Sequence, residues 1–392
     1  MTSTTDSPRT IDFERHNEEV ERVWAAYRQR TPSRVPLIFG INPRFTMFGH
    51  PANPRGMTFE EYSNDPQLML ERQIEHQAWV RTHVPQDAPM GLPKDGWTVY
   101  VDFQNYYEAA WYGARIRYWP SEVPDTEPPL AEDARKWSLI EKGMPDPFAH
   151  GGAQRMWGYY EYFVRKKEEG WSHRGLPIAN VTWPAGGTDG PLTVSCNLRG
   201  TSKFMADLLD DPDYASALLT YVNETSINRI KAYRQRMKVD TKPERGGLAD
   251  DSVQLISTAM YRERILPHHR RYFEELYGPG PHSMHLCGDA TRHFKTIRDE
   301  LNVYSFDTGY PVDFAWLRRE LGPEVEVYGG PSVPFLRSAT PQAVRDETKR
   351  ILTSGIREGG RFALREGNNL APGINLGNLW AMWDAVHEFG LY

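Results

Sequence analysis

Short apolar runs alternate with longer amphipathic stretches along most of the chain. The apolar runs have the length of buried β-strands and are bounded by Gly, Pro, Asn or Asp. Eight of them are strand candidates, at residues 35–41, 98–103, 176–183, 247–250, 282–286, 303–307, 325–328 and 361–364. The amphipathic stretches predict helices over residues 13–30, 59–84, 201–209, 213–238, 262–277, 289–300, 311–321 and 341–358.

The repeated order of strand, loop and helix predicts a parallel sheet. Eight such strands favour an α/β fold closed into a (β/α)8 TIM barrel with an N-terminal helical extension, and an open doubly wound sheet is the alternative. Residues 104–175 are too long for one crossover helix and contain an acidic, proline-rich segment. We interpret them as an insertion after the second strand that lies over the barrel mouth. We expect a flexible segment over residues 1–12 and one domain over 13–392.

The composition is that of a globular protein without a broad basic surface. Hydrophobic residues make up 39% of the 392 residues, and the formal net charge is −6. This balance favours neither nucleic acid nor anionic lipid as a partner. The chain has two cysteines, Cys196 and Cys287, which suits a reducing compartment. No stretch approaches the roughly 18 apolar residues of a membrane span, and the first ten residues lack the features of a signal peptide. We therefore expect a cytoplasmic protein.

Polar side chains are concentrated where the predicted strands end. In barrels of this type the active site is built at the C-terminal ends of the strands, so these positions are candidates for the site. They are Asn42, Arg44, Gln104, Asn105, Glu108, Trp183, Asp189, Asp250, Asp251, His285, Cys287, Asp307, Tyr310, Ser332, Glu366, Asn368 and Asn369. Their convergence on one end of the barrel predicts an active site there.

The segment His285-Leu286-Cys287-Gly288 carries the most specific chemistry. An imidazole and a thiol two residues apart on a strand point to the same side, so both can reach one metal ion or one substrate atom. A thiolate and a neutral imidazole together suit zinc. The alternative is that Cys287 is a small buried side chain and His285 a hydrogen-bonded core residue.

Two further segments add candidates. Asp250 and Asp251 are adjacent at a strand end, so one of them lines the pocket as a general base, a metal ligand or a partner for a cationic substrate. The other caps a turn or a helix, and the alternative is that both only form turns. Asp307 also follows a strand, and the glycine pair at 329–330 allows backbone to approach a ligand closely.

The order of these motifs resembles the uroporphyrinogen decarboxylase superfamily. The resemblance is best from about residue 190 onward and rests on GPLTVSCNLRGTSKFMADLLDDPDYASALL, LADDSVQLIS, MHLCGDATRHFKTIRDELNVYSFDTG, VYGGPSVPFLRSATPQAVRDETKRIL and GNNLAPGINLGNLWAM. It implies a (β/α)8 barrel. The Arg-rich N-terminal signature with which the decarboxylases bind propionates is absent. The chain is more similar to the branch of methyltransferases that pass methyl groups between corrinoid carriers and thiols or methoxylated compounds.

The resemblance also implies roles for individual residues. In the methyltransferase branch, zinc is held by the His and Cys of the motif, which are His285 and Cys287 here, and by a second Cys near the last strand. That later position falls on Asn368, so Glu366 is the remaining candidate for a third metal ligand. The residues expected in catalysis are Asp250, Asp251, Asp307 and Tyr310. Those expected in substrate binding are Asn42, Arg44, Asn105, Glu108, Trp183, Gly330 and Asn368.

Three functions remain in competition at this point. The leading hypothesis is a methyltransferase that moves a methyl group between a small methylated substrate and a thiol or a corrinoid, the corrinoid being carried by a partner protein, with zinc as the cofactor. The second is a metal-independent decarboxylase of a tetrapyrrole or small carboxylic acid, in which Arg44 binds carboxylate. The third is a barrel that binds a corrinoid or other ligand without turning it over. The aromatic content also allows a homodimer interface.

Overall fold

The computed structural model describes residues 11–184 and 189–392, so residues 1–10 of the predicted flexible segment lie outside the described residues. The helices are α1 Phe13–Arg28, α2 Phe59–Asn64, α3 Pro66–His83, α4 Tyr107–Trp111, α5 Ser138–Lys142, α6 Gly152–Glu168, α7 Pro191–Arg199, α8 Thr201–Asp210, α9 Pro212–Met237, α10 Thr258–Met260, α11 Leu266–Leu276, α12 Phe294–Leu301, α13 Phe314–Leu321, α14 Val333–Ser338, α15 Pro341–Leu352 and α16 Leu376–Phe389. The strands are β1 Trp97–Tyr100, β2 Ile116–Arg117, β3 Asp125–Thr126, β4 Ser172–His173, β5 Leu176–Thr182, β6 Gly247–Ala249, β7 His282–Leu286, β8 Val303–Thr308, β9 Glu326–Gly329 and β10 Phe362–Leu364. None of the helices in the described ranges is long and apolar enough to span a membrane.

The main sheet has five parallel strands in the order β10-β9-β8-β7-β6. Its strands alternate with helices along the chain, which is the connection that parallel neighbours require. All five strands therefore end at the same edge of the sheet. The polar residues that follow these strands in sequence are brought to that one edge, as the pattern predicts.

The predicted barrel of eight strands is not closed in this structure, and the first seam, a break in the strand pairing, lies beside residues 35–41. This predicted strand forms only isolated bridges, between Leu37 and Leu364 on one side and between Arg34 and Leu391 at its start. On the other side, the N–H of Leu37 donates to Asp87 Oδ2 at 2.6 Å and the N–H of Phe39 donates to Gln86 Oε1 at 2.9 Å. Side chains thus occupy the hydrogen-bonding edge that β1 would need for pairing.

The second seam lies between β5 and β6. β5 pairs with β1 in parallel and with β4 in antiparallel orientation, which gives a separate sheet of order β1-β5-β4. At the free edge of β6, the described residues show a single parallel bridge between Asp189 and Ala249, together with a hydrogen bond from the N–H of Gly190 to the carbonyl oxygen of Ala249. The fold is therefore an α/β arrangement of the TIM-barrel type that is not closed in this structure.

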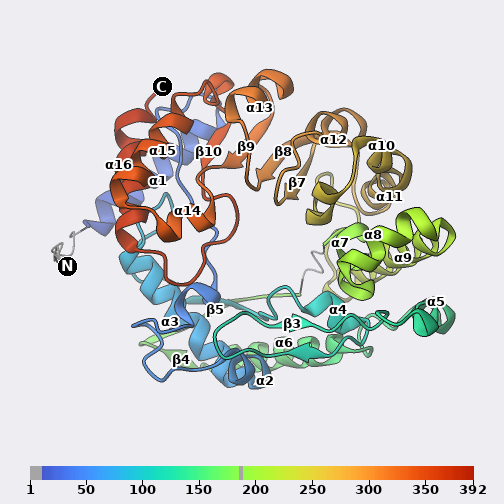
Figure 1. Cartoon of the computed structure of the whole chain (residues 1–392). Helices are drawn as coiled ribbons and strands as arrows, with labels where there is room; N and C mark the ends of the chain where they lie inside the picture. Colours follow the sequence, from blue (N-terminus) through green and yellow to red (C-terminus); the bar gives the residue numbers. More distant parts are fainter. Residues whose placement is uncertain (1–10, 185–188) are drawn as a thin grey trace.

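Two hydrophobic cores lie on either side of these seams. The larger one joins the five-stranded sheet to the helices around it, and includes Leu286, Phe306 and Leu364. The smaller one packs α2, α3 and α6 around β1 and β5, with Trp97 and Phe163 fully buried. In Figure 1 the strands β7 to β10 lie in the upper half of the ring, and α2, α3, α6 and β5 lie in the lower half. The predicted position of residues 104–175 over a barrel mouth stays a prediction.

The predicted helices occur with changed ends. The stretch 59–84 is divided at Asp65, which ends α2 and caps α3, and Pro66 begins the second helix. The stretch 262–277 begins as a π-helix over residues 261–265 and continues as α11. The helices predicted at 289 and 311 begin only at Phe294 and Phe314.

Candidate functional site

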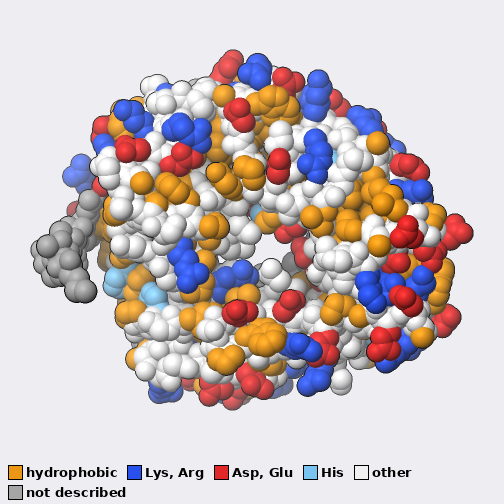
Figure 2. Space-filling view, viewed as in Figure 1, with side chains coloured by type: hydrophobic (Ala, Val, Ile, Leu, Met, Phe, Trp, Pro, Cys, Tyr) orange, Lys and Arg blue, Asp and Glu red, His pale blue; other side chains and the backbone are white. Residues whose placement is uncertain are grey.

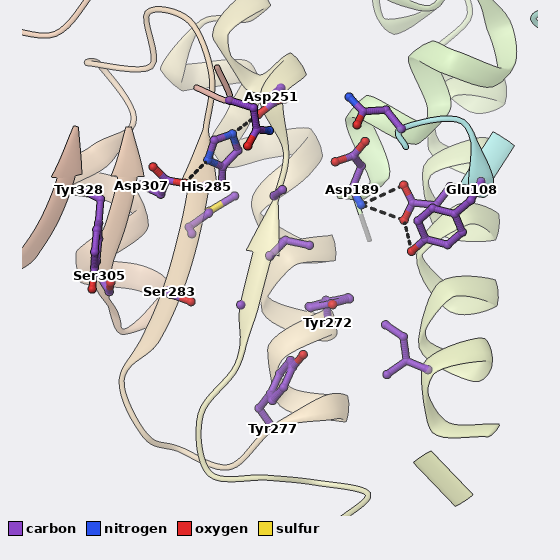
Figure 3. Close-up of a pocket in the computed structure, with 18 of the residues that line it drawn as sticks. Glu108, Asp189, Asp251, Tyr272, Tyr277, Ser283, His285, Ser305, Asp307 and Tyr328 are labelled. Carbon is purple, nitrogen blue, oxygen red and sulfur yellow. Dashed lines mark hydrogen bonds and ion pairs between the residues drawn. The ribbon is translucent and has the colours of Figure 1, made fainter. Parts of the chain in front are cut away.

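A cavity of about 1040 Å³ lies against the inner face of β6 to β9 and reaches α4, α9 and α11. In Figure 2 the molecule is hollowed at its centre, and Figure 3 shows residues of the cavity wall. The interior of a TIM barrel is normally filled by bulky branched side chains. Here four inward positions carry only small side chains, Gly247, Ala249, Ser283 and Ser305. This choice of residues leaves room for a ligand beside the strands.

Three potential metal ligands lie together where the cavity meets the C-terminal ends of β6 and β7. Asp251, His285 and Cys287 each offer one ligand atom, and these atoms lie within 4.8 Å of one another. His285 Nε2 is 3.1 Å from Cys287 Sγ and 3.6 Å from Asp251 Oδ1. The N–H of Cys287 donates to Asp251 Oδ1 at 2.9 Å, which fixes the carboxylate beside the thiol. Burial, followed by the charge of Asp251, raises the pKa of the Cys287 thiol.

A second row of contacts fixes the orientation of the imidazole. His285 Nδ1 donates to Asp307 Oδ2 at 2.8 Å, and Arg365 Nη1 donates to the same oxygen at 2.7 Å. Burial alone would lower the pKa of His285, but the hydrogen bond and the charge of Asp307 outweigh it, so the pKa is raised. Because Nδ1 is engaged with Asp307, Nε2 is the nitrogen that faces Cys287 and Asp251.

Glu366 lies on the far side of Arg365 from the imidazole. Its Oε1 accepts from Arg365 Nη2 at 3.1 Å and from the N–H of Gly40 at 2.9 Å. Burial raises the pKa of Glu366 to about 7, against the opposing charge of Arg365. A side chain at Gly40 would collide with these groups, because an added Cβ would lie 2.6 Å from Glu366 Oε1. The structure therefore places Asp251, and not Glu366, beside His285 and Cys287.

The two adjacent aspartates of the Asp250-Asp251 pair point in opposite directions. Asp250 is completely buried, and its carboxylate accepts from Thr193 N, Thr193 Oγ1 and His269 Nε2 at 2.8, 2.7 and 2.8 Å. It also accepts from Leu192 N at 3.2 Å, so it satisfies the first turn of α7. Asp250 thus joins β6 to α7 and α11, while Asp251 faces the cavity.

On the opposite wall, α4 and the start of the segment before α7 place two carboxyl groups together. The N–H of Asp189 donates to both oxygens of Glu108, at 2.9 and 3.1 Å (Figure 3). Arg229 Nη2 lies 3.5 Å from Glu108 Oε1, and both side chains are buried. Burial raises the pKa of Glu108 to about 7, although Arg229 opposes this change. Burial and the charge of Glu108 raise the pKa of Asp189 well above its ordinary value.

Arg44 forms a third part of the wall. Its Nε donates to Gln104 Oε1 at 3.1 Å, and its Nη2 donates to Asn105 Oδ1 at 3.2 Å. Within residues 11–184 and 189–392 it forms no salt bridge, because these partners are neutral amides. Its guanidinium charge therefore remains available to an anionic group of a ligand.

The structure brings most, but not all, of the predicted site residues together. Those that line the cavity are Arg44, Asn105, Glu108, Trp183, Asp251, His285, Asp307 and Asn368. Cys287 joins them through its contact with His285. Those outside the lining are Asn42, Asp250, Tyr310, Gly330 and Glu366.

Asn42, Gly330 and Tyr310 lie outside the cavity in three different environments. Asn42 accepts from the N–H of Arg44 at 3.1 Å and starts the turn that carries Arg44. Gly330 leaves space for the chain after β10, since an added Cβ would lie 1.9 Å from the carbonyl oxygen of Arg365. Tyr310 is 49% exposed on the surface.

Two residues important to the geometry were not predicted. Arg365 precedes the predicted Glu366, and alternation along a strand end offered no reason to choose it. Arg229 lies in the middle of α9, where it shares the buried face with Val222, Ser226 and Tyr233. A lone arginine at helical spacing on an apolar face is a signal that a buried carboxylate lies opposite.

The donor set of Asp251, His285 and Cys287 fits a zinc ion. With bonds of about 2.0 to 2.3 Å, the ligand atoms of a tetrahedral zinc site lie roughly 3 to 4 Å apart. The separations of 3.1 and 3.6 Å from His285 Nε2 are in this range. Three protein ligands with a neighbouring cavity leave a fourth position for a substrate. The carboxylate of Asp307 on the other imidazole nitrogen is the usual support of a zinc-bound histidine.

A comparison with protein families decides the wider relationship. The sequence profile of "Uroporphyrinogen decarboxylase (URO-D)" matches residues 18–389. The chain belongs to the URO-D family. The resemblance seen in the motifs is confirmed over almost the whole length of the protein, including the N-terminal half where few motifs were recognised.

Individual relatives within and around this family divide between two activities. A methylated-thiol–coenzyme M methyltransferase from Methanosarcina mazei is 27% identical over 169 residues, which are 42% of this chain and 43% of that protein. A uroporphyrinogen decarboxylase from Saccharopolyspora erythraea is 32% identical over 153 residues, 36% of this chain and 40% of that protein. The matches thus span less than half of either relative.

The URO-D chain is also similar in fold to a solved structure described as a methyltransferase from Methanosarcina mazei. The similarity covers 94% of this chain and 98% of that one, with a TM-score of 0.61 and 17% sequence identity. At this identity the likeness establishes a shared fold. It agrees with the barrel-type arrangement described above.

Proposed function

We propose that this URO-D family protein is a methyltransferase that moves a methyl group between a small methylated substrate and a corrinoid or thiol acceptor. The observation that carries the proposal is the cluster of Asp251, His285 and Cys287 at the edge of a large cavity. The partial similarity to a methylated-thiol–coenzyme M methyltransferase supports methyl transfer as the reaction.

The cluster gives each residue a defined task. Asp251, His285 and Cys287 would hold zinc, and zinc supplies a Lewis acid that keeps a bound thiol in its reactive thiolate form. Asp307 holds the His285 ring in the tautomer whose Nε2 lone pair faces the cavity. Arg365 binds Asp307 from the other side and prevents the carboxylate from turning away.

The remaining wall suits a small substrate with a polar end. Arg44, Asn105 and Asn368 present guanidinium and amide groups to the cavity, and Trp183 provides an aromatic surface. We expect Arg44 to bind an anionic or strongly polar group, because its own partners are uncharged. A corrinoid acceptor would be carried by a partner protein that docks at the cavity. A homodimer remains a prediction from composition.

A metal-independent decarboxylase is the second candidate. It is favoured by the similarity to the Saccharopolyspora erythraea enzyme and by three arginines, Arg44, Arg234 and Arg365, that line the cavity and suit carboxylates. In this case the carboxyl groups of the cavity would hold a protonated intermediate, and no zinc would be needed.

Parallel assays separate the two candidates. The purified protein is incubated with O-, N- and S-methyl compounds together with cob(I)alamin, and separately with porphyrinogens and small aromatic acids. The proposal expects methylcobalamin to form in the first set and no carbon dioxide to be released in the second. Carbon dioxide release that survives the Cys287→Ser substitution would establish the decarboxylase instead.

A further inference from the structure

One row of residues paired across the sheet includes polar side chains from both walls of the cavity. Across the strands, Asp189 is paired with Ala249, Ala249 with His285, His285 with Asp307, and Asp307 with Tyr328. Residues paired in register on neighbouring parallel strands have their side chains on the same face. Asp189 therefore faces the cavity at the same height as His285, from the opposite side of β6.

Ala249 leaves a gap in this row. Its methyl group is the smallest side chain of the row, and it also lines the cavity. Since neighbouring strands are about 4.8 Å apart, the backbones of Asp189 and His285 lie about 10 Å apart with this gap between them. A small part of a bound substrate would fit in the space above Ala249. It would then lie between Asp189 on one side and the cluster around His285 on the other.

The position of Asp189 is fixed by its neighbours. Its N–H donates to both oxygens of Glu108, and its bridge to Ala249 fixes the backbone on the other side. Figure 3 shows Asp189 standing between Glu108 and the strands that carry His285. The backbone of Asp189 is thus held from two sides, and the residue lines the cavity.

The charges around Asp189 favour its protonated form. The groups that face it are Glu108 on α4, with Arg229 behind it on α9, and the aspartates 250 and 251 at the end of β6. Burial is the largest cause of its raised pKa, and the negative charges of Glu108, Asp251 and Asp250 add to it. Arg229 Nη2 lies 3.5 Å from Glu108 Oε1.

We propose that Asp189 is the general acid that protonates the heteroatom of the methyl donor when the methyl group leaves. This inference rests on the proposed function. In this step the bond between the methyl carbon and the heteroatom of the donor breaks, and the carbon forms a new bond to a nucleophile, either cob(I)alamin or a thiolate. The electron pair of the broken bond stays on the heteroatom, which takes the proton of Asp189. Asp189 leaves the step as a carboxylate, and a solvent proton restores it.

The assignment predicts the class of methyl donor. A phenoxide, an alkoxide or an amide anion is a poor leaving group unless it receives a proton as the bond breaks, whereas a neutral thioether leaving from a sulfonium needs none. A dedicated proton donor opposite the cluster therefore indicates a donor with a basic leaving group, such as a methyl ether. Glu108 acts as a positioning residue, because both of its carboxylate oxygens accept from the backbone N–H of Asp189.

The test uses a series of methyl phenyl ethers whose ring substituents change the acidity of the phenol, with cob(I)alamin as acceptor. Wild type, Asp189→Asn and Asp189→Glu are compared, with the exposed Asp213→Asn as the matched control. We expect Asp189→Asn to slow transfer from the least acidic phenols about 100-fold or more, the scale of general acid catalysis. Transfer from a nitrophenyl ether should change only a few-fold, and Asp189→Glu should recover part of the lost rate. An equal loss across the series, or no loss, overturns the assignment.

A second measurement does not depend on methyl transfer. The infrared difference spectrum between wild type and Asp189→Asn at pH 7 should contain the carbonyl band of a protonated carboxyl group. Absence of this band at neutral pH overturns the assignment even if the enzyme transfers methyl groups. A wild type that shows the band and transfers a methyl group from a methylated thiol but from no ether overturns the general acid role, whereas a wild type that transfers none from either class of donor overturns the proposed function.

Discussion

His285 and Asp307 face each other in register on neighbouring strands, with Nδ1 2.8 Å from Oδ2. This contact makes Asp307 the residue that sets the tautomer of the imidazole and turns Nε2 toward Cys287. We predict that Asp307→Asn lowers the affinity for zinc about 10- to 100-fold, the range typical for the partner of a zinc-bound histidine. Competition with a chelator measures this change, and the exposed Asp346→Asn serves as control. Unchanged zinc affinity would show that His285 is not a ligand.

Substitutions of Asp250 and of Asp251 should affect different properties, the stability of the fold and the binding of zinc respectively. Asp250→Asn breaks a buried set of hydrogen bonds that includes His269, so we expect the free energy of unfolding to fall by about 3 kcal/mol. Asp251→Asn removes a candidate ligand that is only partly buried, and should lower zinc content with little loss of stability. Urea denaturation and metal analysis of both variants check this. The reverse pattern would place Asp250 in the site.

The pKa of Glu108 predicts a dependence of stability on pH. In the folded protein the carboxyl group of Glu108 keeps its proton up to about pH 7. In the unfolded chain the same group loses its proton near its ordinary pKa of 4.5. Its contribution to stability is therefore complete below pH 4.5 and is lost as the pH rises to 7. We expect the stability difference between wild type and Glu108→Gln to change by about 3 kcal/mol over this range.

Denaturant unfolding at several pH values provides the check on Glu108. The exposed Glu141→Gln is the matched control, and its difference from the wild type should stay constant. Glu366 has a similarly raised pKa of about 7 and is present in both proteins, so it cancels in the comparison. A difference for Glu108→Gln that does not vary with pH contradicts the burial described for this carboxyl group.

Ala249 offers a direct test of the gap between the cavity walls. Ala249→Leu fills the space between Asp189 and His285 with a side chain that faces the cavity. Because displacement of reacting groups by about 1 Å costs about 100-fold in rate, we expect at least this loss of methyl transfer. Zinc content and the melting temperature should be close to those of the wild type and of the exposed Ala134→Leu control. Full activity in Ala249→Leu would place the reaction elsewhere in the cavity.

The sequence predicted the parallel strands and the edge at which the site lies, because alternation and strand ends are local signals. It did not predict the open barrel. The seam beside residues 35–41 depends on the side chains of Gln86 and Asp87, which take N–H groups that a strand would otherwise use. Such a contact between a loop and a strand 50 residues away has no period in the sequence.

Local sequence patterns also could not decide between neighbouring candidates for the site residues. Asp250 and Asp251 have the same chemistry, and only the position of α7 and His269 decides which one is buried. Glu366 is near the last strand as a ligand should be, yet Arg365 separates it from the imidazole. Ligand geometry depends on how strand ends meet in space, and the sequence gives only the order in which they occur.

Metal removal and restoration during methyl transfer is the measurement that tests the central claim most directly. The purified protein is stripped with a chelator, and the formation of methylcobalamin from a methylated donor and cob(I)alamin is followed by absorbance as zinc is added back. The account predicts that activity is lost on stripping and returns in proportion to about one zinc per chain, as the one cluster of three ligands in the described part of the chain requires. It predicts no return of activity in Cys287→Ser. Full activity of the stripped protein would contradict a zinc-dependent methyltransferase at this site.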